Sequence, residues 1–128
     1  MGASTTVVVV VDDDAGTRGA LAQLLRIWGY QPETASDGVE ALEKVRTSRP
    51  VIVISDLRMP RMEGFEFLRT LRRSSPDIHC IIITADRSWE AAAQARTLGV
   101  VDLLEKPIDL QRLQVDLKKC LEKSRPQA

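Results

Sequence analysis

The sequence predicts a single α/β domain with a five-stranded parallel sheet and helices on both of its faces. Short apolar runs recur along the chain, three of them rich in β-branched residues, as in strands that are buried on both faces. These runs are Val7–Val11, Val51–Ile54, Ile81–Ile83 and Val100–Leu104. Segments with helical periodicity separate them, and a weaker extended segment at Tyr30–Ala35 supplies the remaining strand. Alternation of strand and helix is typical of parallel sheets built from β–α–β units.

Each helix is predicted from an apolar stripe or from the residues that start and stop it. The stripes are Leu21, Leu24, Leu25 and Trp28; Val39, Leu42 and Val45; Phe65, Leu68 and Leu71; and Leu110, Leu113, Leu117 and Leu121. Gly29 stops the first helix, Ser36 and Asp37 open the second, and Pro50 follows its end. Ser88 is placed to cap an alanine-rich helix that ends near Gly99.

Composition excludes several classes of protein. The 128 residues include 18 Lys and Arg against 18 Asp and Glu, and a balanced charge argues against bulk binding of nucleic acid or membrane. The longest apolar run is far too short to cross a bilayer. Cys80 and Cys120 lack the spacing and the histidines of a zinc site, so we expect two buried, reduced thiols in a cytoplasmic protein.

Polar residues follow four of the predicted strands. They are Asp12, Asp13 and Asp14; Asp56; Thr84; and Lys106 with Pro107. Because parallel strands end at the same edge of a sheet, and ligands bind there, we expect these side chains to converge. Asp14 and Asp37 are equally well placed to be helix N-caps.

Such an edge favours a divalent cation and a phosphoryl group. At an effective dielectric constant of ~20, two carboxylates about 4 Å apart repel by roughly 4 kcal/mol. A hard cation such as Mg²⁺, or Mn²⁺ in its place, relieves that repulsion. Thr84 and Lys106 offer the hydroxyl and the ammonium that phosphoryl oxygens need, while a carboxylate attacks phosphorus.

The combined motifs resemble the receiver domain of bacterial two-component response regulators. They are Asp12-Asp13-Asp14 after a valine run, Asp56-Leu57-Arg58-Met59-Pro60 with Gly64, Ile83-Thr84-Ala85, and Gly99 through Asp102 to Glu105-Lys106-Pro107. The resemblance implies a flavodoxin-like (βα)5 fold over residues 6–122. Residues 1–5 are then expected to be a disordered N-terminus, and residues 123–128 a tail or the start of a linker.

The resemblance assigns a role to each of these residues. Asp56 is implied as the phospho-acceptor. Mg²⁺ would be held by Asp13, Asp56 and the backbone carbonyl of Arg58, with Asp12 acting through water. Thr84 and Lys106 would bind the phosphoryl oxygens, and the bond before Pro107 would be cis.

The resemblance also implies partners. A sensor histidine kinase or a phosphotransfer protein would supply the phosphoryl group. Phosphorylation would switch the face formed by the fourth helix, fifth strand and fifth helix, which would control an output domain or effector protein. That face would also allow a homodimer, and Glu105-Lys106-Pro107 resembles receivers of transcription factors. Direct nucleic-acid or membrane binding by the domain is not expected, and neither is turnover beyond its own phosphotransfer and dephosphorylation.

Two features depart from this pattern or extend it. Leu103 stands where the family usually has Tyr or Phe, so we expect switching to use the loop and the fourth helix, with Trp89 as a candidate. The alternative for Trp89 is a half-exposed aromatic at a helix start.

Arg58 and Asp86 flank the phosphoryl site, where an ion pair would obstruct water and lengthen the life of the phosphoryl group. Two independent, solvated side chains are the alternative.

A group of arginines lies after Asp56 and along the third helix. The members are Arg58, Arg61, Arg69, Arg72 and Arg73. They favour either docking of an acidic partner or, more simply, a solvated helix face.

Two other functions use the same residues. A phosphohydrolase of the haloacid-dehalogenase type would use Asp12 as nucleophile and Asp14 as general acid and base. Gly16 replaces its usual Thr or Val, and no acidic pair follows Lys106. A receiver-like interaction module that no longer accepts phosphate is the other alternative, and Leu103 is the residue that favours it.

Overall fold

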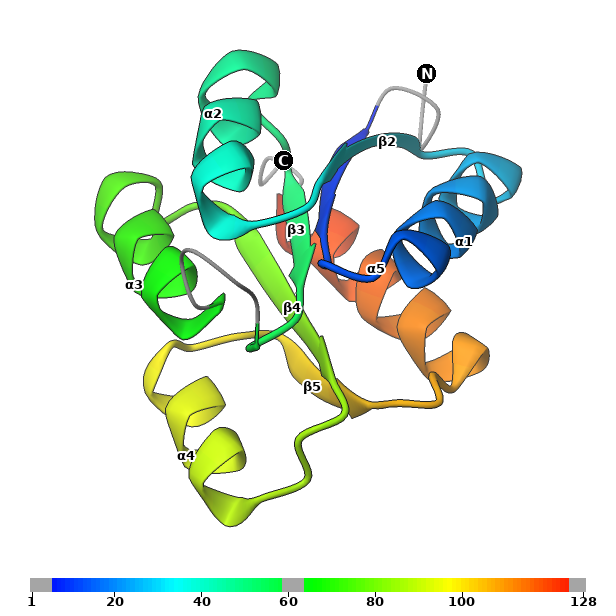
Figure 1. Cartoon of the computed structure of the whole chain (residues 1–128). Coiled ribbons are helices and arrows are strands. Elements are labelled where there is room, and N and C mark those ends of the chain that lie inside the picture. The colour runs from blue at the N-terminus through cyan, green and yellow to red at the C-terminus, as the bar shows by residue number, and fades with distance from the viewer. Residues whose placement is uncertain (1–5, 59–63, 125–128) are drawn as a thin grey trace.

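The computed structural model describes residues 6–58 and 64–124, which form a parallel sheet between two layers of helices (Figure 1). The strands are ordered β2-β1-β3-β4-β5 across the sheet. Their bounds are β1 Val7–Val11, β2 Gln31–Ala35, β3 Ile52–Ser55, β4 His79–Thr84 and β5 Asp102–Glu105. This confirms the predicted fold class, with β3 at the centre between β1 and β4, and with β2 and β5 at the edges.

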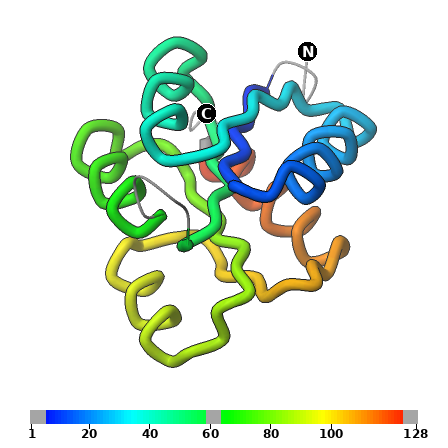
Figure 2. Tube along the Cα trace, viewed as in Figure 1, coloured from blue at the N-terminus to red at the C-terminus, as the bar shows by residue number. Residues whose placement is uncertain are grey.

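One layer of helices contains α1 and α5, and the other contains α2, α3 and α4, as Figure 2 shows along the Cα trace. Their bounds are α1 Ala15–Ile27, α2 Gly38–Ser48, α3 Gly64–Ser74, α4 Trp89–Thr97 and α5 Leu110–Ser124. The predicted C-terminal tail therefore starts inside α5, because residues 123 and 124 are helical. The other residues of that tail, the predicted disordered N-terminus and Arg61 lie outside the described residues.

The sheet divides the core into two clusters. Alternate residues of a strand point to opposite faces, so Val9 and Val11 of β1 join the α2–α3–α4 side while Val8 and Val10 join the α1–α5 side. Cys80 belongs to the first cluster and Cys120 to the second, and both are free thiols, as predicted.

The helix ends follow the predicted signals. Asp14, Asp37 and Ser88 are the N-caps of α1, α2 and α4, and each accepts from a backbone N–H three residues on. Gly29 and Gly99 follow α1 and α4 with φ of 94° and 65°, where a side chain would be strained.

Some predicted positions are wrong in detail. Val39 is 49% exposed, because α2 packs on the sheet through Ala41 and Val45 instead. β3 and β5 begin at Ile52 and Asp102, one and two residues later than predicted, and β4 is longer than predicted. In the described part of the chain, no helix is long and apolar enough to span a bilayer.

Candidate functional site

The site lies at the carboxyl ends of β1, β3 and β5, where one lysine meets two aspartates. The Lys106 Nζ donates to Asp12 Oδ2 at 3.1 Å and to Asp56 Oδ2 at 3.0 Å. Asp12 is 2% exposed and Asp56 is 7% exposed. Two nearly buried carboxylates thus share one ammonium at the sheet edge that the sequence singles out.

Strand pairing brings the two aspartates together. Each directly follows its strand, and its amide still donates to the neighbouring strand, Asp12 to the Ala35 carbonyl at 3.1 Å and Asp56 to the Val11 carbonyl at 3.1 Å. Because β1 and β3 are adjacent, the residues that follow them lie side by side.

Backbone amides fix the orientation of both carboxylates. Asp12 Oδ1 accepts from the Asp14 amide at 2.9 Å, and Asp56 Oδ1 accepts from the Arg58 amide at 3.1 Å. The Arg18 guanidinium reaches back from α1 to the Asp12 carbonyl at 2.7 Å. One oxygen of each carboxylate is therefore held by the backbone and the other by Lys106.

Gly64 packs directly on the backbone of Asp56. A Cβ at Gly64 would lie 1.8 Å from the Asp56 carbonyl oxygen and 2.7 Å from the Leu57 Cα. The Gly64 amide also donates to the Leu57 carbonyl at 3.0 Å. The start of α3 can reach this position only with glycine.

Lys106 keeps its charge in this setting. Burial alone would lower its pKa, but the hydrogen bonds to Asp56 and Asp12 outweigh that effect, so the pKa of Lys106 is raised. Its amide donates to the Thr84 carbonyl at 3.0 Å, and the Lys106–Pro107 peptide bond is cis, as the resemblance implies.

Thr84 ends β4 at the same edge and is buried. Its hydroxyl oxygen accepts from the Asp86 amide at 3.2 Å. The register of β4 and β5 places Thr84 opposite Glu105, the residue before Lys106.

Arg58 and Asp86 form an ion pair beside the site. Asp86 Oδ2 accepts from Arg58 Nη2 at 2.9 Å and from Nε at 3.2 Å. Hydrogen bonds from Ser88, followed by those from Arg58, lower the pKa of Asp86 to about 2. The two side chains are therefore paired rather than independently solvated.

The donors at this edge fit Mg²⁺. Within residues 6–58 and 64–124, no three Asp, Glu, His or Cys side chains gather as a metal cage. Mg²⁺ does not require one, since it takes one or two carboxylates and keeps its waters. Asp56 supplies a carboxylate, and Asp13 is an exposed carboxylate next to Asp12 in the chain. Both are the hard oxygen donors that Mg²⁺ or Mn²⁺ prefers.

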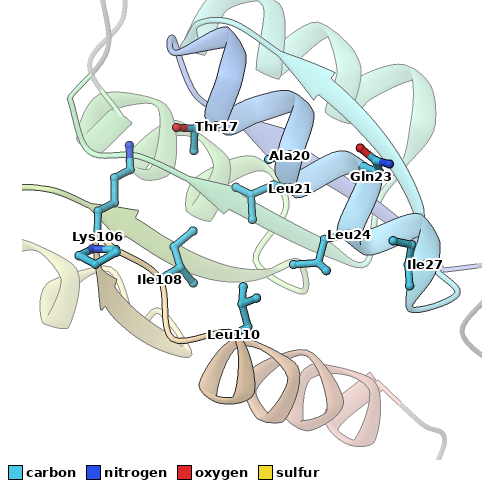
Figure 3. A pocket seen from close by; sticks show the side chains of 10 residues that line it. Thr17, Ala20, Leu21, Gln23, Leu24, Ile27, Lys106, Ile108 and Leu110 are labelled. Atoms are coloured by element: carbon cyan, nitrogen blue, oxygen red, sulfur yellow. The ribbon is translucent and has the colours of Figure 1, made fainter.

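An apolar groove of about 530 Å³ adjoins the site between α1 and the start of α5 (Figure 3). Leu21, Leu24 and Ile27 line it from α1, and Ile108 and Leu110 line it from the chain after Pro107. Figure 3 shows Lys106 and Thr17 at one end of the groove and Ile27 at the other. Lys106 therefore belongs to both the groove and the carboxylate site.

The two predicted switch residues lie apart from the carboxylates. Leu103 is half-buried on β5 and packs against the core cluster on the α4 side. Trp89 opens α4 and is 76% exposed, so it packs less than the half-exposed alternative predicts. It lines a shallow hollow with Ala92, Ala93, Arg96 and Thr97.

Comparison with known proteins decides the family. The sequence model of the response regulator receiver domain matches residues 8–118. The chain belongs to the response regulator receiver domain family.

Relatives of this receiver domain include longer regulators. It is 40% identical over 118 residues to the transcriptional regulatory protein ZraR of Klebsiella oxytoca, covering 92% of this chain and 27% of that protein. It is 35% identical over 120 residues to the response regulator MprA of Mycobacterium avium, covering 94% of this chain and 53% of that protein. The chain therefore spans between about a quarter and a half of the length of these relatives.

Solved structures agree with the fold of this receiver domain. A response regulator receiver protein from Pseudomonas putida superposes with a TM-score of 0.84 at 35% identity, covering 89% of this chain and 96% of that one.

Three structural features of this receiver domain were not predicted, and two of them belong to the site. Arg18 on α1 holds the Asp12 backbone, and the groove runs along α1. Arg72, counted among the docking arginines, instead binds the Ile78 and Pro76 carbonyls and so anchors the loop before β4. Nothing in the local sequence distinguishes such a tertiary anchor from a solvated arginine.

Proposed function

We propose that this receiver domain takes a phosphoryl group onto Asp56 from a sensor histidine kinase or a phosphotransfer protein. The observation that carries the proposal is the Lys106 ammonium held by both Asp12 and Asp56 at the sheet edge. Once Asp56 is phosphorylated, the phosphoryl oxygens would take the place of its carboxylate as hydrogen-bond acceptors for that ammonium.

The chain's own residues prepare Asp56 for in-line attack. The bond that forms joins a carboxylate oxygen of Asp56 to phosphorus, and the bond that breaks joins phosphorus to the leaving group of the donor. The Arg58 amide orients Asp56, while Lys106 and the Thr84 hydroxyl stabilise the charge on the transferred oxygens. Asp13, Asp56 and the Arg58 carbonyl would hold Mg²⁺ or Mn²⁺, and Asp12 would act through water. The metal supplies charge neutralisation.

The groove beside Lys106 supplies the docking surface for the phosphodonor in this proposal. A donor must bring its phosphoryl group to Asp56, so it has to cover the surface next to that residue. The apolar groove along α1 is continuous with the site through Lys106. Replacing exposed Ile27 with Asp should slow transfer from the kinase and leave phosphorylation by a small-molecule phosphodonor unchanged. If the substitution slows transfer from the kinase and phosphorylation by the small molecule equally, the phosphodonor docks on another surface.

The switch in this proposal acts on α4, β5 and α5, which would carry an output domain, an effector protein or a homodimer. Leu103 has no ring or hydroxyl to relay the event, so movement is assigned to the loop after β4 and to α4, including exposed Trp89. Restoring an aromatic residue with Leu103→Tyr should change phosphorylation-dependent partner binding. If phosphorylation-dependent partner binding is unchanged in this variant, position 103 takes no part in the switch.

The test is to identify the phosphorylated residue. We expect Mg²⁺ and acetyl phosphate to place a labile phosphate on Asp56, and Asp56→Asn to abolish it. Asp77→Asn is the matched control, because Asp77 is an exposed aspartate that precedes β4, at the sheet edge opposite the site. Phosphate on Asp12 would instead support the phosphohydrolase alternative, although Asp14, its required acid and base, is occupied as the cap of α1.

A non-phosphorylated interaction module remains the second alternative, and the same experiment separates it. A domain that binds its partner equally well with and without the phosphodonor, and gains no phosphate, would fit that module. The complete set of carboxylates, threonine and lysine at the edge favours phosphorylation instead.

A further inference from the structure

A buried aspartate on α5 takes no part in the site at the sheet edge. Asp116 is 2% exposed, and its Oδ2 is fully buried without a hydrogen-bond partner among the described residues. An ionised carboxylate left in this state would lose most of its hydration without compensation, which is costly. The position therefore favours a neutral carboxyl group.

The partner of Asp116 is Asp102, the first residue of β5. The two carboxyl groups lie within hydrogen-bonding reach of each other, and two carboxyl groups can share a hydrogen bond only if a proton lies between them. Asp102 is also held by Arg112, whose Nε donates to Oδ2 at 2.8 Å and whose Nη2 donates to Oδ1 at 2.5 Å. Because the guanidinium already binds both oxygens of Asp102, that group is the carboxylate and Asp116 is the proton donor.

The surrounding charges do not replace this proton. In the described part of the chain, the charged or titratable groups facing Asp116 are Asp102 from β5 and, on α5, Arg112, Lys119 and Cys120. Burial, then the hydrogen bond and the charge of Asp102, raise the pKa of Asp116 to about 7. Lys119 and Arg112 act in the opposite direction but are outweighed.

We propose that Asp116 and Asp102 hold one proton between them, and that this proton fastens α5 to β5. When the proton leaves to solvent, two carboxylates remain against each other with a single guanidinium, and the contact between α5 and β5 loosens. The device responds to pH and needs no phosphorylation.

Its effect on signalling rests on the proposed function, whereas the shared proton does not. β5 and α5 are two of the three elements of the proposed output face. Partner binding at that face would therefore weaken as pH rises past neutrality. If the wild-type protein shows the expected titration but its partner binding does not change with pH, only the assignment of this face to output is overturned. The shared proton itself would still stand.

The sign of the pH effect distinguishes Asp116 from other groups. Its pKa is higher in the folded than in the unfolded chain, so the stabilisation is complete below about pH 4 and is lost as pH rises through about 7. Burial, followed by nearby Lys123 and Arg72, lowers the pKa of His79, which makes folding more favourable with rising pH instead.

The decisive measurement is a titration of the aspartate carboxyl carbons by NMR in the full chain. We expect one aspartate to titrate near neutral pH, and Asp116→Asn to remove that transition. The folding equilibrium constant of the wild type should fall by up to about tenfold per pH unit across the transition relative to Asp116→Asn. His79 is present in both proteins, so its contribution cancels.

Glu122→Gln is the matched control, because Glu122 is an exposed carboxylate on the same helix. It should keep the wild-type titration and pH dependence. The proposal fails if every aspartate of the wild type titrates below about pH 5, the ordinary range of carboxyl groups. This outcome needs no variant, so misfolding of Asp116→Asn would leave the test intact.

Discussion

Two places in this receiver domain bring two aspartates and one cation together, and they differ in where the cation lies. At the sheet edge, Lys106 lies between Asp12 and Asp56 at 3.1 Å and 3.0 Å. Between β5 and α5, Arg112 binds both oxygens of Asp102, while one buried oxygen of Asp116 has no partner among the described residues.

The difference fits the two proposed uses, a metal and a phosphoryl group at one pair and a shared proton at the other. A bridging ammonium partly offsets both negative charges, and the two carboxylates stay available to a divalent cation. A guanidinium that is bound to one carboxylate leaves the second uncompensated, so a buried carboxyl group takes up a proton instead. Placement of the cation, rather than the number of charges, separates the two sites.

The largest effect is expected from Gly64→Ala, which distorts the Asp56 site without altering a charge. The added Cβ would lie 1.8 Å from the Asp56 carbonyl oxygen, so backbone must move. We expect a loss of about 3 kcal/mol in the free energy of unfolding, measured in urea, together with loss of phosphorylation.

Gly19→Ala is the matched control, because a Cβ at Gly19 in α1 meets nothing within 4 Å. It should stabilise the domain by up to about 1 kcal/mol, as alanine does inside helices. A Gly64→Ala protein as stable and as readily phosphorylated as the wild type would show that α3 does not fix Asp56.

A smaller effect follows from removing each cation in turn. Lys106→Met leaves two nearly buried carboxylates unpaired and should lower the free energy of unfolding by about 2 kcal/mol at neutral pH. Arg112→Met should cost under about 1 kcal/mol, because that arginine is more exposed and, within the described residues, pairs with one carboxylate, that of Asp102, instead of two. Equal losses for the two variants would contradict the distinction between a bridging and a flanking cation.

The smallest change in stability is expected from Arg58→Ala, which opens the mouth of the first site. Its ion pair with Asp86 is exposed, and exposed ion pairs contribute little to stability. The pKa of Asp86 is below its ordinary value, so any such contribution is present above about pH 4 and is lost as pH falls towards about 2.

The kinetic effect of Arg58→Ala is expected to be larger than its effect on stability. Without the pair, water reaches the phosphoryl group more easily, and its lifetime should shorten several-fold. Asp86→Ala should have the same effect, and the double variant should add little to either. If the phosphoryl group of these variants lives as long as that of the wild type, the Arg58–Asp86 ion pair does not control dephosphorylation.

The site at the sheet edge could be predicted because its geometry follows from topology. Asp12, Asp56 and Lys106 each follow a strand, and parallel strands end at one edge whatever the details of packing. The close contact of Gly64 with Asp56 depends on how α3 approaches β3, and a glycine in the sequence does not reveal what it touches.

The proton-sharing pair could not be predicted from the sequence. Helical periodicity indicates which face of a helix is buried, but it does not indicate which residue of another element that face contacts. Asp116 lies three residues after Leu113 and one before Leu117, on the buried side of α5. Leu110, the first residue of the predicted stripe, is 45% exposed and lines the groove instead. Which strand residue faces a helix is decided by tertiary packing, so the partnership with Asp102 becomes visible only in the structure.

The division of the core by the sheet has a consequence for how such a domain can diverge. The two clusters share no residue, so substitutions that reshape α1 and α5 need no compensating change under α2, α3 and α4. A lineage, or an engineer, can therefore change the surface proposed to meet the phosphodonor while preserving the layer that contains α4. Grafting the groove residues of α1 from another receiver is expected to redirect pairing with kinases and leave the packing of the opposite layer unchanged.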